Sequence, residues 1–362
     1  MKEIEIYIHI PYCVRKCRYC DFLSYANASC KEKKTYFEKL ADSIRGDSNC
    51  VVRSVFFGGG TPSSVEAEYI CGILEKIKKE YRIKDNAEIT LEANPGTLTP
   101  GKLKAYKDAG FNRLSIGVQS LNDELLKTMG RIHTAEEARQ GFKMAREAGF
   151  DNINTDLILG YPTQTKKMFG ETLDEIIEMG PEHISAYSLI VEEETPLYDA
   201  IEKGDLPEPS DEDDREMYRM ACEKLKAAGY EQYEISNFAK PGYESIHNTG
   251  YWTGVPYIGY GIAAASYIDG KRLSNNEDLL PMLEERVDKE TAEKEFMMLG
   301  FRLTKGPDSK RFFEMFGEGY EEKFAEILTG LENKKLIDKC ETGYRLSAKG
   351  IDFANEVFGE FI

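Results

Sequence analysis

The chain has 362 residues, enough for two or three domains, and 41% of them are hydrophobic while 31% are charged. This composition excludes a disordered chain, and the formal net charge of −17 disfavours nucleic acid as a partner. No apolar run approaches the length of a membrane span and the N-terminus lacks a signal-peptide core, so we expect a cytoplasmic protein.

Six apolar segments, each followed by a helix-like stretch, predict six strand–helix units within the first 240 residues. The segments begin near Ile4, Val52, Ala87, Arg113, Asn152 and His183. Strands that alternate with helices in this way form a parallel sheet covered by helices. Ser63 and Glu66 have the spacing of a capping box and predict the start of the second helix.

The strands alternate in polarity, which indicates how the sheet closes. In residues 4–10, four isoleucines share one face while Glu5, Tyr7 and His9 share the other, and residues 88–93, 114–119 and 152–157 follow the same pattern. A parallel sheet buried on both faces has continuous apolar strands instead. The polar face therefore predicts an incomplete, TIM-like (β/α)6 barrel with a polar ligand inside, and a flat Rossmann-like sheet is the alternative.

The pattern changes after residue 240, so we predict three parts. Residues 1–240 form the partial barrel, and residues 241–276, rich in Gly, Tyr and Asn, form a connecting segment. Residues 277–362 contain helices, a short hairpin near 337–346 and a last helix from about Ser347. This order predicts a winged-helix-like α+β domain that serves as a lid or a partner surface.

Three of the eight cysteines, Cys13, Cys17 and Cys20, lie within eight residues, directly after the first strand. Neighbouring thiolates repel one another, so such a cluster needs a cation. Three thiolates favour an iron–sulfur cluster with one iron free of protein ligands. Zinc with a remote fourth ligand, or no metal at all, are the alternatives.

Other polar groups gather at the same edge of the predicted sheet. A glycine run at 58–60 and Thr61 follow the second strand, and Glu92, Gln119 and Asp156 stand at the C-terminal ends of polar strand faces. Arg131 follows the fourth strand. Active sites of βα barrels form at this edge, and this set suits a ligand with ammonium, carboxylate and ribose hydroxyl groups.

The segment from Tyr7 to Phe22, together with Gly58–Ser63 (GGGTPS), resembles the radical S-adenosylmethionine (SAM) superfamily. The most similar branch contains oxygen-independent coproporphyrinogen III dehydrogenase and the haem chaperone HemW family, and the resemblance covers nearly the whole chain. It implies a [4Fe–4S] cluster on Cys13, Cys17 and Cys20, with an open iron that chelates SAM. It also implies that SAM contacts Tyr7, Gly59, Gly60, Thr61, Glu92, Gln119, Arg131 and Asp156.

Two departures separate the members of this branch. The dehydrogenase is expected to carry a fourth cysteine where this chain has Phe22. The run His247, Asn248, Tyr251 and Trp252 is similar to the HNxxYW signature of the haem chaperones, and the resemblance implies haem binding there. Imidazole is a good axial ligand for haem iron. The structural alternative is that this run caps a turn and fills the core.

These observations predict a haem chaperone that binds haem and delivers it to apo-haemoproteins, with a [4Fe–4S] cluster and SAM as cofactors. An electron donor such as flavodoxin and a peripheral membrane contact are further expected partners. One alternative is a radical SAM oxidoreductase acting on a tetrapyrrole, namely the oxygen-independent coproporphyrinogen III dehydrogenase. Another is a zinc-bound interaction module.

Overall fold

The computed structural model describes residues 1–362 and contains one mixed sheet of 12 strands. Its centre is six parallel strands: β1 (Lys2–Ile10), β4 (Cys50–Gly59), β5 (Arg82–Ala93), β6 (Arg113–Gln119), β7 (Ile153–Leu159) and β8 (His183–Ser188). The six predicted strands are confirmed. They stand side by side in chain order without the reversal that defines a doubly wound sheet, which favours the barrel-type arrangement over the Rossmann-like alternative.

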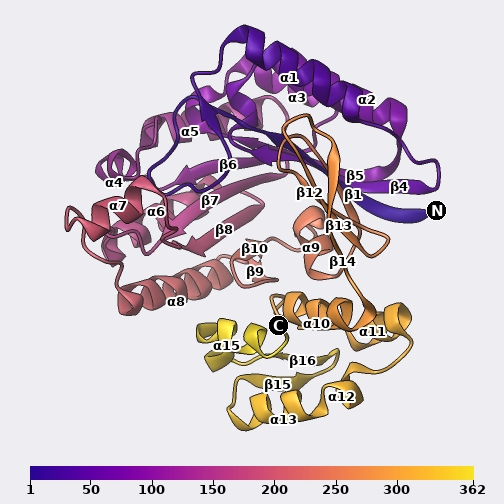
Figure 1. Ribbon diagram of the computed structural model, residues 1–362. Helices are drawn as coiled ribbons and strands as arrows, with labels where there is room; N and C mark the ends of the chain where they lie inside the picture. The colour runs from indigo at the N-terminus through magenta and orange to yellow at the C-terminus, as the bar shows by residue number, and fades with distance from the viewer.

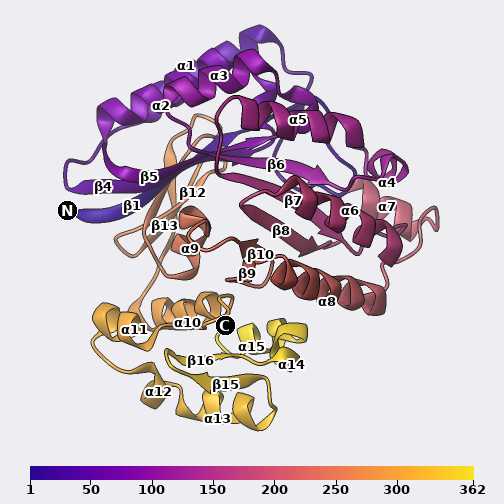
Figure 2. The same ribbon diagram turned by 180° about the vertical axis from the view of Figure 1, so that it is seen from behind.

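Helices cover the outer face of the parallel strands (Figures 1 and 2). They are α1 (Cys30–Ser43), α2 (Ala67–Glu80), α3 (Pro100–Ala109), α4 (Asp123–Thr128), α5 (Ala135–Glu147), α6 (Lys166–Met179), α7 (Pro196–Glu202) and α8 (Asp211–Ala227). The isoleucines at 4, 6, 8 and 10 of β1 are completely buried in the main apolar core. The apolar faces therefore pack outward against helices, and the polar faces are left for the interior.

The sheet extends beyond the predicted strands on both sides and does not close. β11 (Tyr257–Tyr260) pairs with β1 in parallel, and β12 (Ala265–Ile268), β13 (Lys271–Asn275) and β14 (Pro281–Arg286) follow antiparallel. At the other edge, β10 (Asn237–Ala239) and β9 (Glu231–Gln232) continue from β8. Because β14 and β9 are opposite ends of the sheet, the barrel is incomplete. A separate two-residue pairing joins β2 (Tyr12–Cys13) to β3 (Tyr25–Ala26) within the cysteine loop.

The C-terminal part has its own apolar core, which runs from Phe296 to Phe361. Its elements are α10 (Lys289–Gly300), α11 (Ser309–Phe316), α12 (Tyr320–Lys323), α13 (Ala325–Asn333), β15 (Ile337–Cys340), β16 (Gly343–Leu346), α14 (Ala348–Asp352) and α15 (Ala354–Gly359). The hairpin and the helix capped by Ser347 are confirmed. The three-part division stays a prediction, although β14 lies within 277–362 and pairs with β13 of the preceding part.

The predicted capping box is wrong. The N-cap of α2 is Glu66, and no side chain caps it. Ser63 lies in a short 3₁₀ turn, and its Oγ accepts the Asn94 backbone N–H at 3.0 Å. The serine therefore ties the glycine-rich loop to the end of β5 and does not start a helix.

None of the helices combines the length and apolarity required to cross a bilayer.

Candidate functional site

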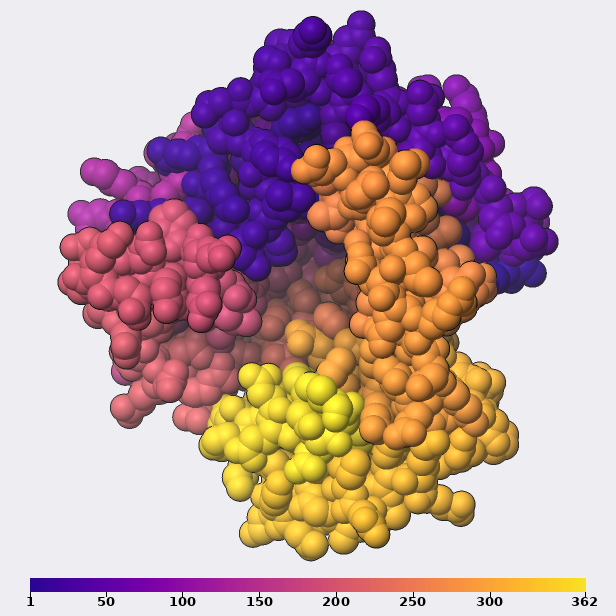
Figure 3. All heavy atoms as spheres, in the orientation of Figure 1, coloured from indigo at the N-terminus to yellow at the C-terminus, as the bar shows by residue number.

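Two adjoining cavities lie on the polar face of the parallel strands, the first of them at their C-terminal edge, on the hollowed face of Figure 3. The first, which we call the thiol cavity, has a volume of about 290 Å³. Its lining includes Cys13, Cys17, Cys20, Gly59, Gly60, Thr61, Glu92, Gln119, Arg131 and Asp156. The structure thus brings together all three cysteines and every predicted SAM residue except Tyr7, which lines the neighbouring cavity.

The three thiols face the thiol cavity as free cysteines with few partners. Cys13 Sγ lies 3.4 Å from Thr61 Oγ1, and Arg131 Nη1 donates to Cys17 Sγ at 3.4 Å. Burial and the two neighbouring thiols raise the pKa of Cys20 to about 11, so a cation is needed to hold this sulfur as a thiolate. Three thiols and no histidine line this cavity, a donor set that fits an iron–sulfur cluster with one open iron better than a closed zinc site with four protein ligands.

Arg131 marks the cationic side of the thiol cavity. Its Nη2 donates to the Gly117 carbonyl at 2.5 Å, which fixes the guanidinium across the end of β6. Its Nε is buried without any hydrogen-bond partner. A buried donor without an acceptor is uncommon and costs free energy, so this atom fits a ligand that brings a negatively charged or carbonyl oxygen.

Two carboxyl groups mark the opposite side. Glu92 accepts the Gly59 N–H at 3.2 Å, while Asp156 accepts from Ser115 Oγ at 3.0 Å and Asn154 Nδ2 at 2.7 Å. Burial and the nearby Asp156 raise the pKa of Glu92 to about 8, and burial also raises the pKa of Asp156. Neither carboxyl has a cationic partner within ion-pair distance, which suits a ligand that supplies an ammonium group or hydroxyl donors.

The second cavity, which we call the imidazole cavity, has a volume of about 270 Å³ and lies deeper between the strands. Phe22, Gly59, Glu92, Ser115 and Asp156 belong to both cavities, so they share a wall. The remaining lining is Tyr7, Phe56, Arg113, Asn154, Ser185, His247, Asn248 and Tyr251. Phe22, which stands where the dehydrogenase is expected to have a cysteine, is the exposed aromatic at the junction.

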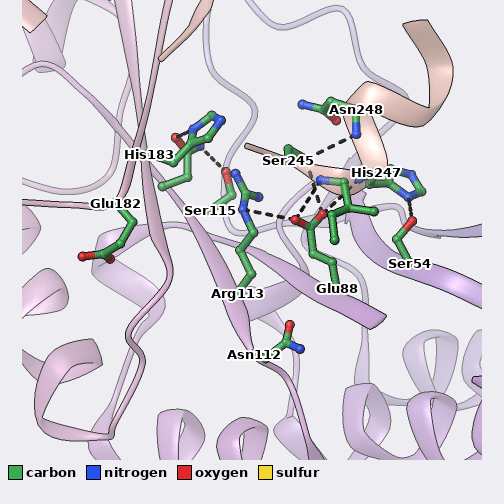
Figure 4. A network of polar contacts seen from close by, with 12 residues as sticks. Ser54, Glu88, Asn112, Arg113, Ser115, Glu182, His183, Ser245, His247 and Asn248 are labelled. Carbon is green, nitrogen blue, oxygen red and sulfur yellow. Dashed lines mark hydrogen bonds and ion pairs between the residues drawn. The ribbon is translucent and has the colours of Figure 1, made fainter. Parts of the chain in front are cut away.

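The HNxxYW run forms a short helix, α9 (Ile246–Trp252), that lies between the strands and the C-terminal part (Figures 1 and 2). Glu88 of β5 anchors its start, because the carboxylate accepts the N–H groups of Ile246 and His247 at 3.0 and 3.2 Å (Figure 4). Arg113 lies 3.8 Å from the same carboxylate. A carboxylate at exposed N–H groups stabilises a helix start, so α9 is fixed on the inner face of the sheet.

His247 is buried, and both of its ring nitrogens have partners. Nδ1 lies 2.8 Å from Ser54 Oγ, Nε2 lies 3.0 Å from the Tyr251 hydroxyl, and the ring stacks on Phe56. Burial, together with Arg113 and Arg53, lowers the pKa of His247 to about 3, so the imidazole is neutral. Burial raises the pKa of Tyr251, so its hydroxyl stays protonated. A neutral imidazole carries one N–H and one lone pair, and Nε2 is the nitrogen next to Tyr251 of the cavity wall.

The HNxxYW run does not act as one surface. Asn248 and Tyr251 line the imidazole cavity with His247, but Trp252 does not. The Trp252 ring lies under the guanidinium of Arg302, 4.3 Å from its central carbon, and so faces the C-terminal part.

Several cavity residues were not among the predicted site residues: Phe56, Arg113, Ser115, Asn154 and Ser185. Ser54, which contacts His247 Nδ1 from outside the cavity lining, was not predicted either. Ser115 and Asn154 belong to the polar strand faces that the alternation identifies. Arg113 and Ser54 carry no motif signal, because strand register alone brings them next to α9.

Comparison with known proteins places the chain in a family. The model of the Radical SAM superfamily matches residues 7–176, and that of the HemN C-terminal domain matches residues 287–353. The haem chaperone HemW of Bacillus subtilis (strain 168) is 38% identical over 98% of both chains, and that of Escherichia coli (strain K12) is 36% identical over 100% of this chain and 99% of the relative. This chain belongs to the HemW family of radical SAM proteins.

A solved structure agrees with this assignment at the level of the fold. Coproporphyrinogen III oxidase (HemN) from Escherichia coli superposes with a TM-score of 0.87 at 22% identity, covering 99% of this chain and 90% of that one. Membership of the radical SAM superfamily gives the chain a [4Fe–4S] cluster and SAM as cofactors. The thiol cavity, with its three free thiols, unpartnered Arg131 Nε and two carboxyls, fits both.

Proposed function

We propose that this chain is a haem chaperone: it binds haem and transfers it to apo-haemoproteins, while a [4Fe–4S] cluster and SAM occupy the thiol cavity. Full-length relatives named haem chaperone HemW, at 34–38% identity, support the proposal. The observation that carries it is the neutral His247, whose Nε2 faces the imidazole cavity and has only the hydroxyl of Tyr251 as a partner.

In the thiol cavity, the three clustered cysteines would hold the [4Fe–4S] cluster. The cluster would supply an open iron for the amino and carboxylate groups of SAM. The Arg131 guanidinium, with its unpartnered Nε, would contact an oxygen of the ligand, and Glu92 and Asp156 would accept its hydroxyl or ammonium donors. The remaining proposed SAM contacts are Tyr7, Gly59, Gly60, Thr61 and Gln119.

The imidazole cavity would receive only part of a porphyrin. Pockets that enclose a small organic ligand usually measure about 300–1,000 Å³, and this one measures about 270 Å³. Haem bound to His247 Nε2 would displace the Tyr251 hydroxyl, lie against Asn248 and extend out of the cavity. A partly exposed haem suits transfer to a client protein. Trp252 would contribute by holding the C-terminal part in place.

The surface around the cysteines supports two further partner proposals. Val14 and Phe22 are exposed beside Arg15 and Lys16, so this loop is apolar and basic although the whole chain carries −17. An acidic electron donor such as flavodoxin, or a peripheral membrane contact, fits that chemistry. We place the protein in the cytoplasm, because a cluster held by three cysteine thiolates suits a compartment that keeps thiols reduced.

An anaerobic haem titration followed by the Soret band tests the proposal. The wild type should show saturable binding with a shifted Soret band, and His247→Ala should lose it. His133→Gln is the matched control, because His133 is also buried and bonds to the Val118 carbonyl outside both cavities. Bound haem should then pass to an added apo-haemoprotein. Absence of a saturable signal in the wild type would exclude a haem chaperone.

The same preparation separates the oxidoreductase alternative. With reductant, SAM and coproporphyrinogen III, a dehydrogenase would form 5′-deoxyadenosine and a decarboxylated porphyrinogen together. We expect no decarboxylated product, since Phe22 stands at the junction of the cavities where the dehydrogenase is expected to have a cysteine.

A further inference from the structure

A row of polar side chains crosses three neighbouring strands next to Asp156. Ser115 of β6 lies opposite Asn154 of β7, and Asn154 lies opposite His183 of β8. Figure 4 shows Ser115 and His183 of this row. All three side chains are buried, and His183 lines neither cavity. Burial of polar groups costs free energy unless they bond to one another, so the bonds within the row decide what it does.

Asn154 is the centre of the row, and its amide uses every hydrogen-bonding position. Nδ2 donates to Asp156 Oδ1 and to Ser115 Oγ, each at 2.7 Å. Oδ1 lies 2.6 Å from His183 Nδ1 and accepts from Ser185 Oγ at 3.2 Å. An amide nitrogen only donates and an amide oxygen only accepts, so these four bonds fix which way the amide faces. The amide in turn holds the Asp156 carboxyl.

His183 has one tautomer because of its two neighbours. Burial and the nearby Arg113 lower the pKa of His183 well below its usual range, so the imidazole is neutral. Since Asn154 Oδ1 only accepts, Nδ1 carries the proton and Nε2 keeps the lone pair. The hydroxyl of Tyr233, 2.8 Å from Nε2, is therefore the donor in that bond. Burial raises the pKa of Tyr233, which keeps this hydroxyl protonated.

Tyr233 stands where the C-terminal part docks on the sheet. Its hydroxyl accepts the Ser245 N–H at 3.3 Å, at the start of α9. Its backbone carbonyl accepts the Thr304 N–H at 3.0 Å, and the next residue, Glu234, pairs with Leu303 in an isolated antiparallel bridge. The hydroxyl that fixes the imidazole is therefore itself held by α9 and by the C-terminal part.

The resulting bonds all run in one direction and end on Asp156. Tyr233 donates to His183, His183 donates to Asn154, and Asn154 donates to Asp156. Hydrogen bonds linked in this way in a protein interior polarise and strengthen one another. Burial raises the pKa of Asp156, and the bond from Asn154 acts against that effect. The chain of bonds thus favours a carboxylate that accepts donors from the cavities it lines.

We propose that His183 is a positioning residue for SAM: through Asn154 it holds the Asp156 carboxyl in the orientation that accepts hydroxyl groups of the cofactor. This inference rests on the proposed SAM site in the thiol cavity and adds a residue that lines neither cavity. Only Nδ1 of the ring faces Asn154, so the role belongs to that nitrogen. Tyr233 supports it by bonding to Nε2, which leaves the proton on Nδ1.

The test is a pair of substitutions at His183 in the full-length, cluster-reconstituted protein. Asparagine places its amide near the position of Nδ1 and keeps a donor to Asn154, whereas glutamine places its amide near Nε2 and does not. In calorimetric titrations with SAM, His183→Gln should bind about 5-fold more weakly, the size of one lost hydrogen bond. His183→Asn should bind within about 2-fold of the wild type. Iron and sulfide contents should stay at the wild-type level in both variants.

Tyr233→Phe tests the same chain of bonds from its far end by removing one oxygen atom. SAM affinity should fall by about 3-fold, because Nε2 can then take the proton from Nδ1. The matched control is Tyr230→Phe, which removes another buried hydroxyl of the same segment. That hydroxyl donates to the Pro181 carbonyl at 2.7 Å, outside the row, so this variant should bind SAM as the wild type does.

Equal SAM affinity in His183→Asn and His183→Gln would overturn the inference, since the packing of the ring and not its Nδ1–H would then matter. If the histidine variants do not fold, Tyr233→Phe decides, and an affinity equal to that of Tyr230→Phe overturns the inference. Asp156→Ala separates the inference from the proposed site. If Asp156→Ala binds SAM like the wild type, or if the wild type binds none, the proposed site itself fails, which is a distinct outcome.

Discussion

The two cavities share a wall but differ in how their polar atoms are used. In the thiol cavity, three thiols line open space with few partners, and the buried Nε of Arg131 has none. In the imidazole cavity, both ring nitrogens of His247 are already hydrogen-bonded to other side chains of the protein, Ser54 and Tyr251. The first cavity is therefore built to take a ligand without rearrangement, whereas the second must give up a hydrogen bond before iron can bind. Substitutions in the thiol cavity should therefore abolish ligand binding. Substitutions in the imidazole cavity should instead change haem affinity or the free energy of unfolding.

The largest effect is expected at the thiol cavity. Replacing Cys13, Cys17 and Cys20 together by alanine should reduce bound iron from about four atoms per chain to nearly none, because no other side chains there can replace the thiolates. SAM affinity should fall with it. Iron and sulfide analysis after anaerobic reconstitution, followed by calorimetric titration with SAM, measures both.

The control for this substitution is Cys30→Ala, which removes an exposed thiol at the start of α1. Its iron content and SAM affinity should match those of the wild type. If the triple variant kept the iron content and the SAM affinity of the wild type, the cluster would have to lie elsewhere. The thiol cavity would then not be the cofactor site.

A smaller effect is expected at Glu92, which lies in the wall that the two cavities share. The pKa of Glu92 is raised from 4.5 to about 8 by burial and by Asp156, so the folded protein binds a proton that the unfolded chain releases. The contribution of Glu92 to the free energy of unfolding should therefore decrease as the pH rises from about 4.5 to 8 and level off above that range. Glu92→Gln should flatten this dependence, as measured by urea unfolding of SAM-free protein at a series of pH values.

Glu136→Gln is the control for the pH series, since Glu136 is exposed on α5 and its pKa is lowered, not raised. It should leave the slope between pH 4.5 and 8 in place. A slope that persists unchanged in Glu92→Gln would mean that Glu92 is ionised in the free protein. The wall between the cavities would then carry a negative charge before SAM binds.

The sequence predicted the thiol cavity better than the imidazole cavity for a physical reason. The period-two alternation in residues 4–10 assigns each side chain to one face, and parallel strands end at one edge, so Cys13, Glu92 and Asp156 had to meet there. No such rule positions α9. Its place depends on Glu88, which Arg113 contacts, and on the pairing of β11 with β1. The Glu88 contact to α9 and the β1–β11 pairing both join segments more than a hundred residues apart.

Local signals were also misleading where tertiary contacts competed with them. Ser63 has the spacing of a capping residue, but its hydroxyl bonds to Asn94 at the end of a neighbouring strand. The haem site on the HNxxYW run stays a prediction, and the structure shows only that its side chains divide around the helix axis, with Trp252 against Arg302. β11 was not predicted as a strand of the sheet, because its four residues include a glycine and lie in a Gly- and Tyr-rich segment.

The smallest effect is expected at Trp252, and it tests whether the HNxxYW run is divided. Trp252→Phe should lower the free energy of unfolding by about 0.5–2 kcal/mol, because a smaller ring binds the Arg302 guanidinium more weakly. Haem affinity should stay within about 2-fold of the wild type, since Trp252 does not line the imidazole cavity. Chemical unfolding followed by circular dichroism, beside a haem titration, measures the two quantities. Tyr251→Phe is the matched comparison: it removes the hydroxyl that hydrogen-bonds to His247 Nε2, so haem should bind more tightly. A loss of haem affinity in Trp252→Phe at unchanged stability would instead assign the indole to the haem and join the two halves of α9 into one surface.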